Sequence, residues 1–88
     1  MKAIQITIRG KVQGVGFRYY TKQKADECKL TGFVQNRVDG SVYLEAQGED
    51  VDIDTFADWC RLGPEWSRVI ECNISEMPLA SFNKFEVK

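Results

Sequence analysis

The feature that most constrains the fold is the order in which strand-like and helix-like periodicities alternate along the chain. Residues 4–8 alternate between isoleucine and polar side chains, which predicts a half-buried strand. From Arg18 to Leu30 the apolar residues recur at helical spacing instead. Gly32 is placed to end that helix at a C′ position. The chain therefore begins as a strand, a loop from Gly10 to Phe17, and a helix.

A hairpin follows the first helix. Phe33 to Val38 predicts a second strand, and Asp39-Gly40 is a strong signal for a tight turn. The segment from Ser41 to Gln47 alternates apolar and polar residues, as the partner strand of a hairpin does. These segments predict two adjacent antiparallel strands.

The second half of the chain predicts another helix and further strands. A stripe of Ile53, Phe56, Ala57 and Cys60 has helical spacing. Gly63-Pro64 ends this helix, residues 69–75 predict a fourth strand, and residues 85–87 can supply a short last one. We expect Trp59 and Trp66 to pack against the core in this region.

Carboxylates precede and open the second helix. Asp50, Asp52 and Asp54 suit the positive end of a helix dipole, so we interpret them as capping and first-turn charges. A metal site is the alternative interpretation of the same residues. The chain contains no histidine, which excludes a Cys/His zinc site.

The order strand, helix, strand, strand, helix, strand favours one architecture. We predict an α+β, ferredoxin-like split βαβ sandwich, in which an antiparallel sheet of four or five strands carries both helices on one face. A chain of 88 residues has room for a single core, so we expect one domain over residues 1–88. Because this fold serves many functions, function has to be argued from a site.

Composition excludes several classes of protein. The net charge is −1, so no overall positive field attracts nucleic acid or anionic lipid. No apolar run approaches the ~20 residues that a membrane-spanning helix needs, and the N-terminus lacks the apolar core of a signal peptide. We therefore expect a cytoplasmic protein without nucleic-acid or membrane partners. We also expect a monomer, since nothing in the sequence suggests a large exposed apolar patch.

The chain contains three cysteines, and their spacing does not suggest disulfide pairs. Cys28, Cys60 and Cys72 are odd in number and form no CxxC motif, so a disulfide framework is not expected. We expect three thiols, at least two of them packed as small hydrophobic side chains.

The loop from Gly10 to Arg18 is the strongest local feature. Its glycines allow the positive φ angles that gather successive backbone N–H groups into one concavity, and the helix that follows adds the positive end of its dipole. Arg18 supplies a planar guanidinium that matches two oxygens of one phosphate. The pattern fits a site for a compact dianion, and it also fits a purely structural turn beside an exposed arginine. It lacks the Lys-Ser/Thr ending of a nucleotide-binding P-loop.

This loop and a downstream segment resemble two signatures of the acylphosphatase family. Gly10 to Arg18 resembles the first signature, while Gly32 to Asn36, Gly40 to Val42 and Gly48 resemble the second at its expected spacings. The resemblance spans essentially the whole chain. Lys29 departs from it, because many relatives carry glycine there, but this residue has no part in the implied chemistry.

The resemblance implies a hydrolase that converts an acyl phosphate and water into a carboxylate and inorganic phosphate, with no metal or organic cofactor. Arg18 and Asn36 are the implied catalytic residues, Asn36 positioning the attacking water. The implied phosphate-binding residues are Gln13, Gly14, Val15, Gly16, Phe17 and Arg18. The backbone of the first five and the side chain of the last would hold the phosphoryl group. A shallow site that binds only the phosphoryl end would accept many acyl groups, so we expect a broad substrate range, and the physiological substrate is left open.

Alternatives remain at this point. Asn36 shares a strand face with Val34 and Val38, so its amide points toward an apolar surface unless the strand ends there. It can therefore tie the strand to the loop instead of, or as well as, orienting water. A non-catalytic anion-binding module would need the loop and Arg18 but not this amide. An RNA-binding domain of the same strand order is a weaker alternative, since residues 31–34 are only faintly similar to its sheet motif.

Overall fold

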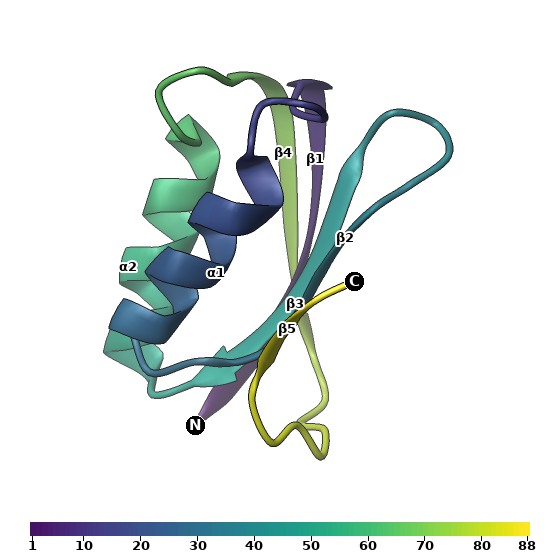
Figure 1. Cartoon of the computed structure of the whole chain (residues 1–88). Helices are drawn as coiled ribbons and strands as arrows, with labels where there is room; N and C mark the ends of the chain where they lie inside the picture. The colour runs from purple at the N-terminus through teal and green to yellow at the C-terminus, as the bar shows by residue number, and fades with distance from the viewer.

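The computed structural model describes all residues from Met1 to Lys88. The elements, in chain order, are β1 (Lys2–Lys11), α1 (Phe17–Glu27), β2 (Thr31–Asn36), β3 (Val42–Gly48), α2 (Asp50–Leu62), β4 (Arg68–Met77) and β5 (Phe85–Val87). This is the predicted order of strands and helices. Both helices cover the same face of the sheet (Figure 1).

The sheet has five strands in the order β4-β1-β3-β2-β5. Neighbouring strands are antiparallel from β4 to β2, whereas β5 runs parallel to β2. The sheet is thus mixed, and the prediction of a wholly antiparallel sheet is corrected at β5. The physical reason is the connection between the two edge strands: residues 78–84 cross the end of the sheet, so the chain returns beside β2 in the direction of β2.

The core lies between the sheet and the two helices. The isoleucines of β1 are Ile4, Ile6 and Ile8, and each exposes at most 2% of its surface. Phe17 from α1 and Phe56 from α2 are buried against them. Each such side chain stabilises the fold by about 1.5–3 kcal/mol through removal of apolar surface from water. The predicted strand and helix periodicities are confirmed by this burial.

Helix α1 ends earlier than predicted, and Gly32 does not end it. Lys29 adopts the left-handed conformation with φ 57°, and the N–H of Leu30 donates to the carbonyl of Ala25 at 2.9 Å. This is a Schellman ending with lysine at the position that usually holds glycine. Gly32 lies instead in β2, where an added Cβ would be 1.9 Å from the carbonyl oxygen of Glu45. Close approach of two strands explains this glycine.

The hairpin turn begins two residues earlier than predicted. Strand β2 ends at Asn36, and the main chain closes the turn by a hydrogen bond from the N–H of Arg37 to the carbonyl of Ser41 at 2.9 Å. Val38, predicted in the strand, is fully exposed in the turn. Asn36 pairs with the buried Val42, but as the last residue of β2 it is itself exposed and not buried in the core.

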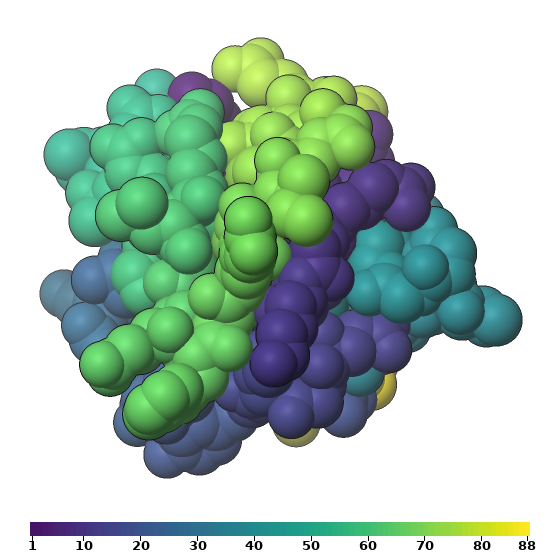
Figure 2. Space-filling model, turned by 90° about the horizontal axis from the view of Figure 1, so that it is seen from above, coloured from purple at the N-terminus to yellow at the C-terminus, as the bar shows by residue number.

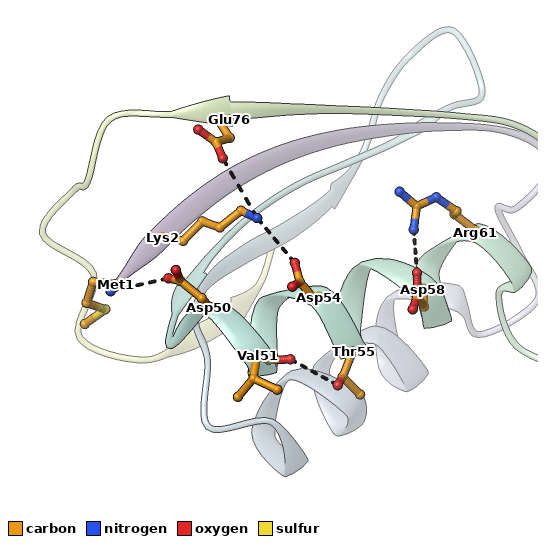
Figure 3. A network of polar contacts seen from close by, with 9 residues as sticks. All are labelled: Met1, Lys2, Asp50, Val51, Asp54, Thr55, Asp58, Arg61 and Glu76. Carbon is orange, nitrogen blue, oxygen red and sulfur yellow. Dashed lines mark hydrogen bonds and ion pairs between the residues drawn. The ribbon is translucent and has the colours of Figure 1, made fainter.

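The carboxylates of α2 take part in ion pairs with the start of the chain. Asp50 lies 3.4 Å from the N-terminal ammonium group, and Asp54 lies 3.3 Å from Lys2 (Figure 3). The N-cap residue is Glu49, and no side chain accepts a capping hydrogen bond there. The prediction of first-turn charges is confirmed for Asp50 and Asp52, whereas that of side-chain capping is wrong. No group of three or more histidine, cysteine or carboxylate side chains is arranged to hold a metal ion.

The tryptophans and cysteines differ in burial. Trp59 packs against Phe56 with ring centroids 6.4 Å apart, but Trp66 is 71% exposed in the loop after α2, so its predicted packing is wrong.

Cys28 and Cys60 are buried and Cys72 is partly buried, all as free thiols, as predicted. Burial raises the pKa of Cys60 well above its usual value, which keeps that thiol protonated. No helix in the structure has the length and apolar character needed to span a membrane.

Candidate active site

The predicted phosphate-binding loop lies at the end of the molecule where the β2–β3 hairpin also projects. Figure 2 looks down on this end, with the segment after β1 lying between the hairpin and the loop that follows α2. Gly14 and Gly16 have φ angles of 74° and 77°, in the left-handed region that residues with a Cβ rarely adopt. These two residues turn the chain so that it enters α1 directly.

The start of α1 leaves its backbone donors unpaired. Gly16 is the N-cap residue, no side chain caps this end, and the first turn contains no carboxylate. None of the N–H groups from Gly14 to Tyr19 donates to a protein atom; the first that does is that of Tyr20, which donates to the carbonyl of Gly16 at 3.1 Å. A helix start with free N–H groups carries a partial positive charge and suits an anion.

Arg18 lies within this first turn and is held by the last residue of the chain. Its Nη1 donates to a main-chain oxygen of Lys88 at 2.7 Å. That residue is itself fixed, because the N–H of Lys88 donates to the carbonyl of Val34 at 2.8 Å. A guanidinium has five N–H donors, so this contact fixes the orientation of Arg18 and leaves donors for a ligand.

A cavity of about 290 Å³ joins the loop to the end of β2. Its lining includes Gly14, Gly16, Phe17, Arg18 and Asn36, which are five of the predicted site residues. Two segments separated by a whole helix therefore meet at one cavity. Arg18 is the one side chain with a formal charge in the lining, which gives the cavity a positive character.

Gln13 and Val15 lie outside the lining of this cavity. Val15 is partly buried against the core. The side-chain Nε2 of Gln13 donates to the carbonyl oxygens of Arg37 and Ser41, each at 2.8 Å. One amide thus bridges the loop to both ends of the hairpin turn that follows Asn36. Sequence reasoning assigned only the backbone of Gln13 and missed this contact, because no local pattern reveals it.

A contact between β1 and the turn supports the same arrangement. Arg9 Nη1 lies 3.0 Å from a carboxylate oxygen of Asp39, whose other oxygen accepts hydrogen bonds from Ser41. These Ser41 hydrogen bonds, with a smaller contribution from Arg9, hold the pKa of Asp39 far below its usual range. The carboxylate therefore stays charged at neutral pH. Aspartate at the start of a turn is a common sequence signal for this local hydrogen bonding.

The lysines near the loop are engaged elsewhere or lie in solvent. Lys11 is exposed, and Lys22 Nζ contacts a carboxylate oxygen of Asp26 at 3.0 Å and the carbonyl oxygen of Phe85 at 3.1 Å. Neither lines the cavity that contains Arg18 and Asn36. Positive charge at the site therefore comes from Arg18 and the start of α1.

Another cavity of about 290 Å³ lies on the opposite side of α1, lined by residues of both helices and of the loop after α2. Tyr20, Trp59 and Trp66 supply its apolar lining, and Glu27 and Glu65 supply carboxylates. Its one cation, Lys24, lies 3.8 Å from a carboxylate oxygen of Glu27, and the lining has neither an arginine nor a helix start, so it lacks the combination found at the loop.

Known proteins match the chain over almost its full length. The model of the acylphosphatase family matches residues 4–87. An acylphosphatase from Oceanobacillus iheyensis is 44% identical over 90 residues, which cover 100% of this chain and 99% of that protein. The chain belongs to the acylphosphatase family. This membership confirms the predicted activity, hydrolysis of the bond between a carboxyl group and phosphate.

Solved acylphosphatase structures share the fold closely. That from Bacillus subtilis superimposes with a TM-score of 0.96 at 35% identity, covering 100% of this chain and 99% of that chain. That from Coxiella burnetii has a TM-score of 0.95 at 38% identity, covering 99% of this chain and 92% of that chain. The predicted ferredoxin-like acylphosphatase fold is confirmed.

Proposed function

We propose that the chain hydrolyses acyl phosphates by holding the phosphoryl group in the loop from Gln13 to Arg18 while Asn36 orients the attacking water. One observation carries this proposal: the unpaired N–H groups at the start of α1, Arg18 and Asn36 lie at one cavity. The loop binds the reacting group, and the end of β2 supplies the group that directs water to it.

Phosphate binding follows from the charge of the loop. The phosphoryl group of an acyl phosphate spreads its negative charge over terminal oxygens, which accept hydrogen bonds from the backbone N–H groups from Gly14 to Phe17. The guanidinium of Arg18 provides a bidentate, charge-assisted contact. These donors are fixed before substrate binds, so little reorganisation is needed when charge shifts in the transition state.

The leaving group removes the need for a general acid. Water oxygen attacks phosphorus, the bond between phosphorus and the acyl oxygen breaks, and the electron pair leaves with the carboxylate. A carboxylate is a weak base and needs no proton on departure. Phosphoryl transfer of this kind requires mainly positioning and charge stabilisation, which a chain without histidine can provide.

Asn36 contributes orientation rather than proton transfer. A carboxamide is too weak a base to deprotonate water, but its oxygen and NH₂ group can accept and donate hydrogen bonds to one. The proton lost by the water goes to an oxygen of the transferred phosphate, so the products are a carboxylate and dihydrogen phosphate. Gln13 supports this geometry, because it binds both ends of the turn that follows Asn36.

Metal independence, a monomeric state and a cytoplasmic location belong to the same proposal. The positive charge that a metal would bring is supplied by Arg18 and the helix start. The helices and sheet of residues 1–88 enclose one continuous core, which supports a single domain. Three free thiols, two of them buried, are typical of a reducing compartment.

The test is release of inorganic phosphate from acetyl phosphate and benzoyl phosphate by the purified chain with EDTA present. We expect turnover that EDTA does not change and that added phosphate inhibits competitively. Phosphate binding without turnover would instead identify a non-catalytic anion-binding module. Activity that disappears with EDTA and returns with a divalent cation would refute metal independence.

A further inference from the structure

The cavity contains apolar surface that the phosphoryl group does not use. Tyr19 is 61% exposed and Val87 is 44% exposed, and both line the cavity together with Arg18 and Asn36. With the phosphoryl group held by the backbone of the loop, the acyl group of a substrate has to leave the loop toward solvent. These two side chains are the exposed apolar groups of that cavity.

The Tyr19 ring is held in place by two neighbours on α1. Its ring meets that of Tyr20 edge to face, with centroids 5.1 Å apart and an angle of 79° between the planes. Its hydroxyl accepts a hydrogen bond from Nε2 of Gln23 at 3.3 Å. A ring fixed in this way loses little rotational freedom when a ligand packs against it.

Val87 is fixed by the sheet. It pairs with Val34 in the parallel register of β2 and β5, and the next residue donates its N–H to the Val34 carbonyl at 2.8 Å. The two apolar side chains come from different elements, α1 and β5, and contribute to the same cavity. They therefore provide two positions at which an acyl group can make contact.

Charge in the cavity limits which acyl groups fit. Arg18 is its one charged side chain, and the phosphoryl group requires it. Lys22, in the neighbouring shallow cavity that also includes Val87, is bound by Asp26 and the Phe85 carbonyl. An acyl group that carries its own carboxylate or phosphate meets no second cationic side chain in the lining of this cavity.

We propose that Tyr19 and Val87 form an acyl subsite, and that the chain prefers aromatic and other uncharged apolar acyl phosphates. This inference rests on the proposed function, because it takes the loop as the phosphoryl site. Acetyl phosphate is too small to contact both side chains, and an anionic acyl group such as that of succinyl phosphate has no partner. Benzoyl phosphate presents an aromatic face to Tyr19 and apolar edges to Val87.

The test compares kcat/KM for benzoyl, acetyl and succinyl phosphate, each divided by its rate of spontaneous hydrolysis. We expect wild type to favour benzoyl phosphate over the other two by about tenfold or more. In Tyr19→Ala, kcat/KM for benzoyl phosphate should fall about tenfold, mainly through KM, with acetyl phosphate changed less than twofold. A subsite that binds ground state and transition state alike changes KM rather than kcat.

Controls separate the subsite from folding and from the phosphoryl site. Trp66→Ala removes another exposed aromatic ring, on the far side of α1, and should leave all three substrates unchanged. Tyr19→Phe keeps the ring without the Gln23 hydrogen bond and should keep the benzoyl preference. Inhibition by phosphate should be the same in Tyr19→Ala as in wild type.

Two outcomes would contradict the inference, and a third concerns the activity itself. An unchanged ratio of benzoyl to acetyl hydrolysis in Tyr19→Ala would show that Tyr19 does not contact the acyl group. Preference for succinyl phosphate in wild type would show a cationic subsite instead. Failure of wild type to hydrolyse any of the three would overturn the proposed function, which distinguishes that failure from loss of selectivity alone.

Discussion

The two helices of this fold begin in opposite ways. Helix α1 begins after Gly16 with no carboxylate in its first turn and with unpaired N–H groups, and Arg18 adds positive charge there. Helix α2 begins after Glu49 with Asp50 and Asp52 in its first turn. Each helix follows a strand and packs on the same face of the sheet, so the backbone architecture does not explain the difference.

The difference shows which helix start is available to a ligand. At α2, side-chain carboxylates interact favourably with the positive end of the helix dipole. Two of these carboxylates also form ion pairs with the N-terminal ammonium group and with Lys2 (Figure 3). At α1, no protein group plays that part. An anion from solution can therefore bind at α1, whereas at α2 it would meet carboxylates.

Removing Arg18 should have the largest effect, because it takes away the side-chain charge that distinguishes the start of α1 from that of α2. We expect Arg18→Gln to lower kcat/KM by a factor of 10² to 10³ or more and to weaken phosphate binding strongly, because a preorganised charged donor is lost. Phosphate release and phosphate inhibition measure the two effects, and circular dichroism verifies the fold. A folded variant that retained more than about a tenth of wild-type activity would refute the role of Arg18.

Removing the amide at the end of β2 should separate binding from reaction. We expect Asn36→Ala to lower kcat by a factor of about 10² to 10³ while leaving the dissociation constant of phosphate within about threefold of wild type. The loop and helix start that bind phosphate are unchanged by this substitution. If phosphate binding fell as much as turnover, Asn36 would be a structural or binding residue instead.

Releasing the loop from the hairpin should have an intermediate effect. In Gln13→Ala the carbonyl oxygens of Arg37 and Ser41 lose their side-chain donor, so Asn36 is held less firmly relative to the loop. We expect kcat to fall about tenfold, with KM and phosphate inhibition nearly unchanged, since imprecise positioning affects the reaction more than ground-state binding. Equal losses in kcat and in phosphate binding would contradict this positioning role.

Neutralising a carboxylate at the other helix start should matter least. We expect Asp50→Asn to lower the free energy of unfolding by less than about 1 kcal/mol, because the residue is exposed and its ion pair is weakened by solvent. Activity should not change. A loss of turnover in this variant would show that the two helix starts are coupled, which the comparison above does not allow.

Local patterns in the sequence predicted much of the fold. The alternation at residues 4–8, the helical stripe around Phe56 and the turn at Asp39-Gly40 each depend on contacts with near neighbours or on one buried face. The loop into α1 was predicted for the same reason, because glycine and arginine requirements are local.

The errors arose where distant segments decide the structure. Gly32 matches a helix ending in sequence, but it is needed where β2 approaches the carbonyl of Glu45. The parallel direction of β5 depends on which strand lies at the sheet edge. The side-chain role of Gln13 depends on a hairpin more than twenty residues away. None of these partners can be inferred from neighbouring residues.

The bridge from Gln13 to the hairpin also bears on how activity appears during folding. Its two hydrogen bonds join residues 24 and 28 positions apart, and β1, which precedes Gln13, pairs with both β3 and the distant β4. Non-local pairings of this kind close slowly, after local helices and turns have formed. The loop from Gln13 to Arg18 and Asn36 therefore reach their relative positions only when the central strands pair. The rate at which enzymatic activity recovers in a refolding experiment would measure the rate of that pairing.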